Sequence, residues 1–179
     1  MNDLIEYIND NISQVNKNNH IHIVLGKNIS ENIFNSRLDH SYINTFLKKI
    51  NKYDKNTKLE HFKMYKHKNS ITMINNKQNI HYSYIIDNSK KICFDRISVY
   101  ANIYKVLAYN DLGMSIYNYD YIQDIQLYQI SIDNLFIIEV LNTLDNDLNK
   151  EYFTIHFIIK KPNQDNKLLK KLKEILNLL

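Results

Sequence analysis

Three stretches of the chain carry apolar residues at helical spacing. The first, predicted as a helix over residues 3–16, has them at Leu4, Ile5, Ile8, Ile12 and Val15. A second helix is predicted from about Ser41 to the polar NKYDKNT stretch, and a third follows Pro162 with leucines on one face and lysines on the other. Each helix has one apolar face, so each is expected to pack against the rest of the fold.

From about Lys58 to Lys161 the pattern changes to short β-branched and aromatic runs separated by Asn, Asp and Lys clusters. The runs are HFKMY, SITMI, IHYSYII, ICFDRISVY, IYKVLAY, IQLYQISI, LFIIEVL and EYFTIHFIIK. The connections are too short for the helices that link parallel strands, which favours an antiparallel sheet or barrel.

One more strand is predicted earlier in the chain, over residues 20–26 (HIHIVLG). Apolar residues alternate there with His20, His22 and Val24, and Gly26 is expected to end the strand. Since His20 and His22 are two residues apart, both imidazoles leave the same face.

Together these elements predict an α+β fold, an antiparallel β-barrel or tunnel of about eight strands flanked by an N-terminal, a second and a C-terminal helix. The chain has 179 residues, enough for one hydrophobic core, and neither a linker nor a repeat divides it. We therefore expect a single domain over residues 1–179.

Composition narrows the function classes. No apolar run approaches the roughly 18 to 20 residues of a membrane span, and the first residues lack the order of a signal peptide. The lone Cys93 cannot form an internal disulfide. These features favour a soluble, cytoplasmic protein in a reducing compartment, with no membrane partner.

The residue bias adds two exclusions. Asn, Ile, Lys and Tyr are favoured and all have AT-rich codons, which indicates an AT-rich genome. With two glycines in the chain, glycine-rich phosphate loops are excluded. Arginine occurs only as Arg37 and Arg96, so bidentate phosphate recognition is scarce, and the net charge of +4 names no partner.

Two segments, read together, resemble the triphosphate tunnel enzymes. Residues 20–26 resemble that family's first strand, Glu-apolar-Glu-apolar-Arg-apolar-Gly, and residues 153–159 (FTIHFII) resemble its late strand with alternating glutamates. The stretches ISENIFNSRLDHSYINTFLKKI and IQLYQISIDNLFIIEV, the latter with Asp133, resemble segments between them. The resemblance is strongest to RNA 5′-triphosphatase domains of mRNA-capping enzymes of large DNA viruses, which implies a viral protein.

In that family the glutamates bind Mg²⁺ or Mn²⁺ in the tunnel, while arginines and lysines bind the triphosphate. The positions matching the glutamates here are His20, His22, Thr154, His156 and Ile158, and Val24 matches the arginine. Hard divalent cations prefer carboxylate oxygens, so the family's hydrolysis is not expected. Lys105 matches a basic tunnel position and Lys160 shares a strand face with His156, so both are predicted phosphate-binding residues.

A different metal site follows if the first and late strands are neighbours, as the resemblance implies. His156 then joins His20 and His22, and three imidazoles suit zinc, copper or nickel. The alternative is a set of hydrogen-bonded sheet histidines that would repel one another once charged at acidic pH. No other cofactor is predicted, and no catalytic residue.

Three functions remain open. The leading hypothesis is a catalytically inactive, triphosphatase-like binding or assembly subunit of viral-type mRNA capping or transcription, with other capping or transcription subunits as partners and weak RNA or triphosphate binding. The second is a metal-dependent phosphohydrolase acting on RNA 5′-triphosphate, nucleoside triphosphate or polyphosphate. Its metal ligands would come from Glu60, Asp95, Asp133, Glu139 or Glu151. The third is an interaction protein with a filled barrel. The character of the barrel interior discriminates among them.

Overall fold

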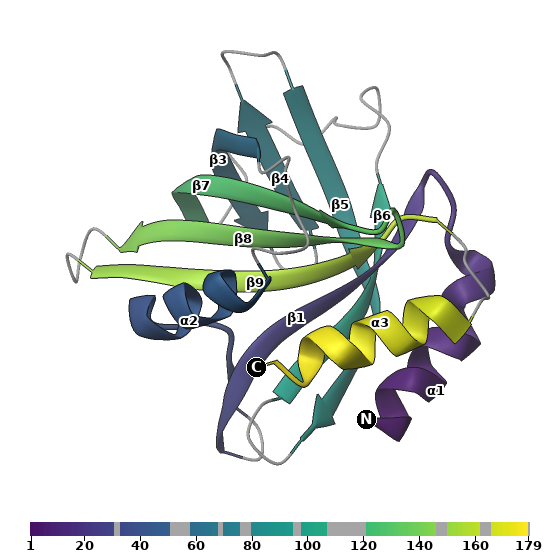
Figure 1. Ribbon diagram of the computed structural model, residues 1–179. Helices are drawn as coiled ribbons and strands as arrows, with labels where there is room; N and C mark the ends of the chain where they lie inside the picture. Colours follow the sequence, from purple (N-terminus) through teal and green to yellow (C-terminus); the bar gives the residue numbers. More distant parts are fainter. Residues whose placement is uncertain are drawn as a thin grey trace.

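In the computed structural model of the chain, the strands form one curled antiparallel sheet with three helices packed outside it (Figure 1). The structure describes residues 1–30, 33–50, 58–67, 70–75, 80–94, 98–106, 121–145, 150–161 and 166–178. The helices are α1 (Asn2–Asn11), α2 (His40–Ile50) and α3 (Asn166–Leu176), and a 3₁₀ turn, η1 (Ile12–Gln14), follows α1. The strands are β1 (Asn19–Ser30), β2 (Ile33–Asn35), β3 (Lys58–His67), β4 (Ser70–Asn75), β5 (Ile80–Cys93), β6 (Ser98–Val106), β7 (Tyr121–Ile132), β8 (Phe136–Asp145) and β9 (Lys150–Ile159).

The two ends of the sheet meet at β1. Eight strands follow the order β1-β6-β5-β4-β3-β7-β8-β9, and β9 then pairs with β1 from Ile21–Ile159 to Val24–His156. The short β2 pairs with β1 beyond this point, from Lys27 onward. The predicted α+β fold with an antiparallel barrel of about eight strands and three flanking helices is confirmed.

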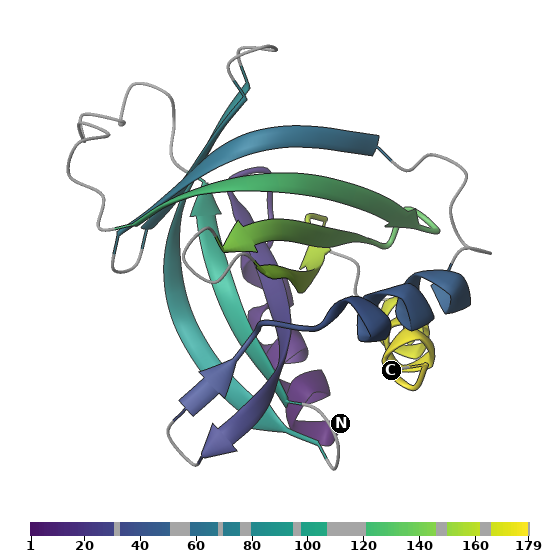
Figure 2. The same cartoon turned by 90° about the vertical axis from the view of Figure 1, so that its left-hand side faces the viewer.

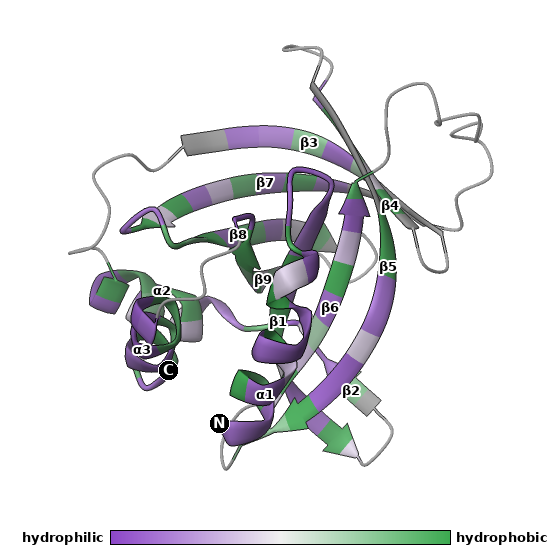
Figure 3. Cartoon of the chain, turned by 90° about the vertical axis from the view of Figure 1, so that its right-hand side faces the viewer, coloured by the Kyte–Doolittle hydropathy of each residue, from purple (hydrophilic) through white to green (hydrophobic). Residues whose placement is uncertain are grey.

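The larger hydrophobic core lies between the barrel's outer face and the helices. On β1, Ile21, Ile23 and Leu25 point outward and are 0% exposed. Helices α2 and α3 lie side by side on one flank (Figure 2), and Lys49 Nζ donates a hydrogen bond of 2.6 Å to the Leu178 carbonyl. Figure 3 shows the alternation of hydrophobic and polar residues along β7 that gives each strand a core-facing side.

A second, smaller apolar cluster fills part of the barrel interior. Its buried members are Phe62, Ile71, Met73, Tyr104, Ile125, Leu127 and Leu141. They come from β3, β4, β6, β7 and β8, so side chains from most of the circumference meet inside. The barrel therefore has apolar packing on both of its faces.

Three details of the predicted elements were wrong. Gly26 does not end the first strand, because β1 continues to Ser30. The ICFDRISVY run is not one strand, since β5 ends at Cys93 and β6 begins at Ser98. The first helix is α-helical only as far as Asn11 and then tightens to a 3₁₀ turn.

Within the part of the chain that the structure describes, no helix has the length and apolar character required to cross a membrane.

Candidate functional site

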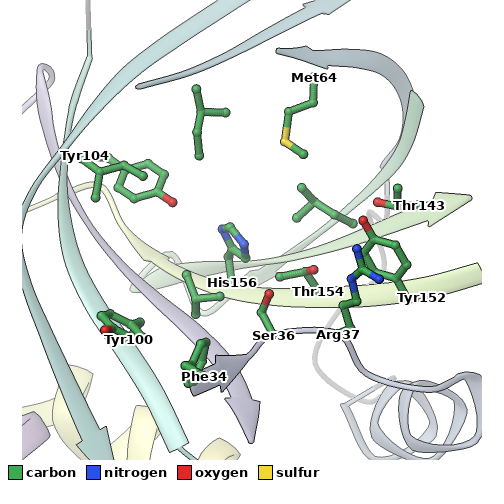
Figure 4. Close-up of a pocket in the computed structure, with 14 residues that line it drawn as sticks. Phe34, Ser36, Arg37, Met64, Tyr100, Tyr104, Thr143, Tyr152, Thr154 and His156 are labelled. Carbon is green, nitrogen blue, oxygen red and sulfur yellow. The ribbon is translucent and has the colours of Figure 1, made fainter. Parts of the chain in front are cut away.

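A cavity of about 380 Å³ opens into the barrel on the side where β1, β2 and β9 meet (Figure 4). Its lining combines aliphatic and aromatic side chains with hydroxyl groups, one imidazole and one guanidinium. The lining residues are Val24, Phe34, Ser36, Arg37, Met64, Ile71, Ile86, Tyr100, Tyr104, Leu141, Thr143, Tyr152, Thr154 and His156. Several of them also belong to or pack against the inner apolar cluster, so the cavity is continuous with it.

Gly26 lets the chain close over one side of the cavity mouth. A Cβ atom at this position would lie 2.5 Å from Cζ and 2.8 Å from Cε2 of Phe34, and would also overlap the carbonyl oxygen of Asn35. Without a side chain at Gly26, the Phe34 ring settles against β1 and meets the Tyr100 ring edge-on at a centroid distance of 4.9 Å.

The chain after β2 is fastened to β9. The Leu38 N–H donates to the Phe153 carbonyl at 2.8 Å, and the Phe153 N–H donates back to the Leu38 carbonyl at 3.0 Å. Arg37 directly precedes this bridge, with its Cζ 4.4 Å from the centre of the Tyr152 ring. The guanidinium is thus held over an aromatic ring at the cavity mouth.

The floor of the cavity is built around Tyr104. Its ring stacks on the buried His22 imidazole at a centroid distance of 3.7 Å with an interplanar angle of 12°. Burial raises the pKa of the Tyr104 phenol, with a further contribution from the charge of Glu139, so the phenol stays neutral. In Figure 4 its hydroxyl points into the cavity, as does the His156 ring from β9.

The three predicted metal ligands lie close together inside the barrel. The His22 ring is 6.2 Å from the His20 ring and 6.0 Å from the His156 ring. Burial lowers the pKa of His20 to about 4, helped by the charge of Lys160, and lowers the pKa of His22 well below its usual value, helped by the neighbouring histidines. Both are therefore neutral at physiological pH, the form in which imidazole binds metals.

Among the described residues, no three His, Cys, Asp or Glu side chains are arranged to hold one metal ion. In the present arrangement the His22 imidazole packs face to face with Tyr104 rather than converging on a shared point. The zinc site at His20, His22 and His156 stays a prediction.

The acids considered for a phosphohydrolase divide between the two faces of the barrel. Glu60 shares a strand face with Phe62 and lies inside, as does Glu139, which accepts a hydrogen bond of 2.7 Å from Gln129. Burial raises the pKa of Glu139, the charge of Glu60 adds to this, and Lys160 opposes it. The interior thus holds two carboxylates near one ammonium.

The other three acids do not join this pair. Asp133 lies in the β7–β8 turn at a φ of 48° and forms an ion pair of 3.4 Å with Lys171 of α3. Glu151 is exposed on the outer face of β9. Asp95 lies outside the described residues.

The two predicted phosphate-binding lysines are placed differently. Lys105 follows Tyr104 on β6 and therefore points away from the cavity, where it pairs with Asp87 at 2.5 Å. Lys160, directly after β9, is half-buried, and its charge acts on His20, His22 and Glu139. Only Lys160 of the two adds positive charge to the barrel interior.

No family model matches the sequence, and no curated protein does. Two solved structures are nevertheless similar to it, both of the triphosphatase of the mimivirus mRNA capping enzyme, an enzyme described as trifunctional. Each alignment covers 99% of this chain and 95% of the mimivirus chain. Their TM-scores are 0.62 and 0.61, at 11% and 12% sequence identity. The chain has the fold of a viral RNA triphosphatase. The resemblance that residues 20–26 and 153–159 indicated is confirmed as a likeness of fold.

Within this triphosphatase fold, the positions that resemble the family's glutamates do face the interior. The register pairs β1 with β9 so that His22 lies opposite Ile158 and Val24 opposite His156. Imidazole, hydroxyl and aliphatic groups at these positions do not fit Mg²⁺ or Mn²⁺, which prefer carboxylate oxygens. The family's metal site is therefore not reproduced at these positions.

Sequence reasoning missed the residues that shape the mouth of the triphosphatase-fold cavity. These residues, Phe34, Ser36 and Arg37, come from the segment after β1. Gly26 leaves the space in which this segment packs against β1. One signal was available for Arg37, because it is one of two arginines in a chain that otherwise uses lysine.

Proposed function

We propose that this protein is a catalytically inactive relative of viral RNA triphosphatases that acts as a binding or assembly subunit. One observation carries the proposal: apolar side chains from β3, β4, β7 and β8 pack inside the barrel, and the glutamate-like positions of β1 and β9 carry no carboxylate. Phosphoryl transfer needs charge stabilisation in its transition state, and the apolar part of the interior supplies little.

The proposed setting is viral-type mRNA capping or transcription in the cytoplasm. It is supported by the fold shared with the triphosphatase of the mimivirus capping enzyme. In this setting the subunit contacts other capping or transcription subunits and binds RNA or triphosphate weakly. Copurification of the tagged protein with capping subunits encoded by the same genome, at near-stoichiometric amounts, tests this role.

The inactivity is tested by measuring phosphate release. RNA 5′-triphosphate, ATP and tripolyphosphate are each incubated with the purified protein and Mg²⁺, Mn²⁺ or Zn²⁺. We expect release no faster than in the protein-free reaction. Metal-dependent turnover of any of the three substrates would contradict the proposal.

The second candidate is a phosphohydrolase that uses the interior pair Glu60 and Glu139, and it is favoured by their position beside Lys160. If turnover is found, Glu60→Gln and Glu139→Gln should each reduce it at least about a hundredfold, the scale of losing a metal ligand or a transition-state contact. Glu151→Gln, on the outer face of β9, is the matched control and should retain full activity.

We also propose that the barrel interior takes up zinc at His20, His22 and His156, and phosphate at Lys160. Thermal unfolding with Zn²⁺ or tripolyphosphate tests both, since a ligand at a hundredfold its Kd adds about 2.7 kcal/mol to stability. His20→Ala should abolish the zinc shift and Lys160→Gln the tripolyphosphate shift. His61→Ala, at an exposed position of β3, is the control.

A further inference from the structure

We propose that the exposed face of α3 binds the phosphodiester backbone of RNA without reading its base sequence. The contacts come from Lys167, Lys170 and Lys173, which we call the lysine stripe. Helix α3 lies outside the barrel (Figure 1), so this surface is separate from the interior described above. The inference rests on the proposed function for one choice alone, that of RNA among phosphodiester polymers.

The lysine stripe occupies one side of α3 because the other side is buried. Leu168, Leu172 and Ile175 face the outer core and are at most 3% exposed, which turns the three lysines to solvent. Residues three apart are neighbours on a helix surface. At a rise of about 1.5 Å per residue, Lys167 and Lys173 are separated by about 9 Å along the helix axis. The stripe thus presents three ammonium groups along one exposed face.

The charge of the lysine stripe is not neutralised within the part of the chain that the structure describes. The one acid of α3, Glu174, lies 3.2 Å from Lys171, which also pairs with Asp133 at 3.4 Å. None of the three stripe lysines forms an ion pair with a described residue. Like charges three residues apart on a helix repel one another. A bound polyanion would relieve this repulsion.

Helix α2 extends the basic surface past the end of α3. The two helices lie side by side in Figure 2, and a hydrogen bond of 2.6 Å joins Lys49 Nζ to the Leu178 carbonyl. The last turn of α2 thereby brings the exposed Lys48 and Lys49 to the C-terminal end of α3. Together with the lysine stripe, these two residues form a positive surface on two neighbouring helices. Such a surface attracts a chain of phosphates more strongly than a single anion.

The side chains of this surface suit phosphate groups and not bases. A lysine ammonium is a compact point charge on a flexible stem, so it contacts phosphate oxygens without the fixed geometry that base recognition requires. Helix α3 contains no aromatic residue and therefore offers no ring on which a base could stack. Contacts of this kind supply affinity without sequence preference.

The same face of α3 disfavours a membrane or a protein as its partner. A basic amphipathic helix binds an anionic membrane by burying its apolar face in the lipid, and in α3 that face already packs in the outer core, where Ile175 is 0% exposed. A stable protein interface needs apolar or aromatic anchors. The large hydrophobic residues exposed in the described part of the chain all lie on strands, namely Ile29, Ile85 and Leu144. The observations therefore favour RNA.

Fluorescence anisotropy with labelled oligouridylate and oligoadenylate tests the inference. Both RNAs carry 5′-hydroxyl ends, so no triphosphate is present. We expect their Kd values to agree within about tenfold, since their phosphates are the same. For a single strand, each phosphate contact makes the plot of log K against log salt steeper by about 0.7. The triple variant Lys167→Gln, Lys170→Gln, Lys173→Gln should therefore have a slope shallower by about 2, and should bind at least about tenfold more weakly at about 0.1 M salt.

A matched control removes the same charge elsewhere. The triple variant Lys63→Gln, Lys90→Gln, Lys150→Gln replaces exposed lysines of β3, β5 and β9. It should bind both RNAs within about threefold of the parent chain, because charges more than about 10 Å from the phosphates are largely screened at this salt concentration. Thermal unfolding checks that both variants are folded. The stripe variant should not melt below the parent chain, since it loses only like-charge repulsion.

Several results would overturn the inference. It fails if neither RNA binds, if the stripe variant keeps the affinity and salt slope of the parent chain, or if the control variant loses as much affinity. It also fails if the two RNAs differ by more than about tenfold, which would mean that bases are read. Binding to phosphatidylserine vesicles without RNA binding would assign the surface to a membrane, and tighter binding of oligoglutamate than of RNA would assign it to an acidic protein.

The proposed function is tested in separate assays. Metal-dependent phosphate release, or the absence of capping subunits in the copurification, would overturn that function and leave the lysine stripe as an RNA contact. Unchanged RNA binding in the stripe variant would overturn only the inference drawn from α3.

Discussion

The outer and inner faces of the barrel are built from the same strands but differ in what they pack against. On the outer face, Phe157, Ile155 and Ile138 are 0% exposed and meet helices or neighbouring aromatic rings. On the inner face, Ile71 and Met73 retain 9% and 7% exposure, and Ile71 lines the cavity of about 380 Å³. Under the helices the outer face is closed, whereas the inner face is only partly filled.

This difference separates the side chains that stabilise the fold from those that line its interior. Most buried apolar side chains lie in the outer cluster, which supplies the larger share of hydrophobic stabilisation. Inner positions are therefore under weaker packing constraint than outer ones. The shared fold at 11% identity with the mimivirus triphosphatase agrees with such a division.

The largest expected effect comes from removing an outer aromatic ring. Phe157 packs 6.4 Å from the ring of Phe46 and 6.2 Å from that of Phe136, so Phe157→Ala leaves a cavity between β9 and α2. We expect a loss of about 3–5 kcal/mol in the free energy of unfolding. Met64→Ala, at the half-buried cavity lining, should cost under about 2 kcal/mol. Urea denaturation measures both, and equal losses would remove the distinction between the faces.

Acidification should destabilise the inner face selectively. The folded protein holds the pKa of His20 at about 4 and that of His22 well below its usual value, whereas both are near 6.5 when unfolded. Between these values the unfolded chain binds more protons, so stability falls as pH drops from about 6.5 toward about 4. The slope is at most about 1.4 kcal/mol per pH unit for each histidine, and the raised pKa of Glu139 acts in the opposite sense.

Chemical denaturation at a series of pH values measures this slope. His20→Asn should flatten it, whereas His61→Asn, on the outer side of β3, should leave it unchanged. A slope that persists in full in His20→Asn would mean that His20 does not contribute.

A side chain at Gly26 should open the cavity mouth without dismantling the barrel. Gly26→Ala forces Phe34 and Asn35 away from β1, for which we expect a loss of about 1–3 kcal/mol. Ser30→Ala, on the same strand, is the control, and urea denaturation measures both variants. Unchanged stability in Gly26→Ala would show that β2 moves freely.

The smallest effect is expected at Lys105. Its ion pair with Asp87 lies on the outside, with the two side chains 49% and 53% exposed. Lys105→Gln should therefore change stability by less than about 1 kcal/mol, with a smaller difference at high salt. Calorimetry with tripolyphosphate is the more sensitive measurement. Weaker binding of tripolyphosphate to Lys105→Gln than to the parent chain would mean that Lys105 contacts phosphate after all.

The parts of the fold that the sequence predicts are those set by local periodicity. The third helix buries Leu168, Leu172 and Ile175 as its apolar spacing requires. The two-residue period of β1 likewise places His20 and His22 on one face, and the register with β9 brings His156 beside them. The helix face and the strand face depend on neighbours in the chain, which a pattern carries, whereas the pairing of the first and late strands was expected only from the resemblance to the triphosphate tunnel enzymes.

The parts that escaped prediction depend on approaches between distant segments. Gly26 looks like a strand terminus, yet its role is to make room for Phe34, which arrives after the chain has turned back. Arg37 lies in a stretch without periodicity, and its contact with Tyr152 and its place in the cavity lining mark it as part of a site only once the chain is folded. The apolar inner cluster likewise joins residues that are adjacent only once the barrel closes.

The strand β1 changes partners along one edge, pairing with β9 from Ile21 to Val24 and with β2 from Lys27 to Ser30. This change of partner occurs at the cavity mouth. The segment that frames the opening, which includes β2, therefore pairs with β1 outside the closed ring of eight strands and is not part of that ring. Insertions, deletions or exchanges between Lys27 and Leu38 could then remodel which molecules gain access while the ring keeps all of its own pairings. Selection could act on this branch as an interchangeable module, changing what the barrel recognises at little cost to how the chain folds.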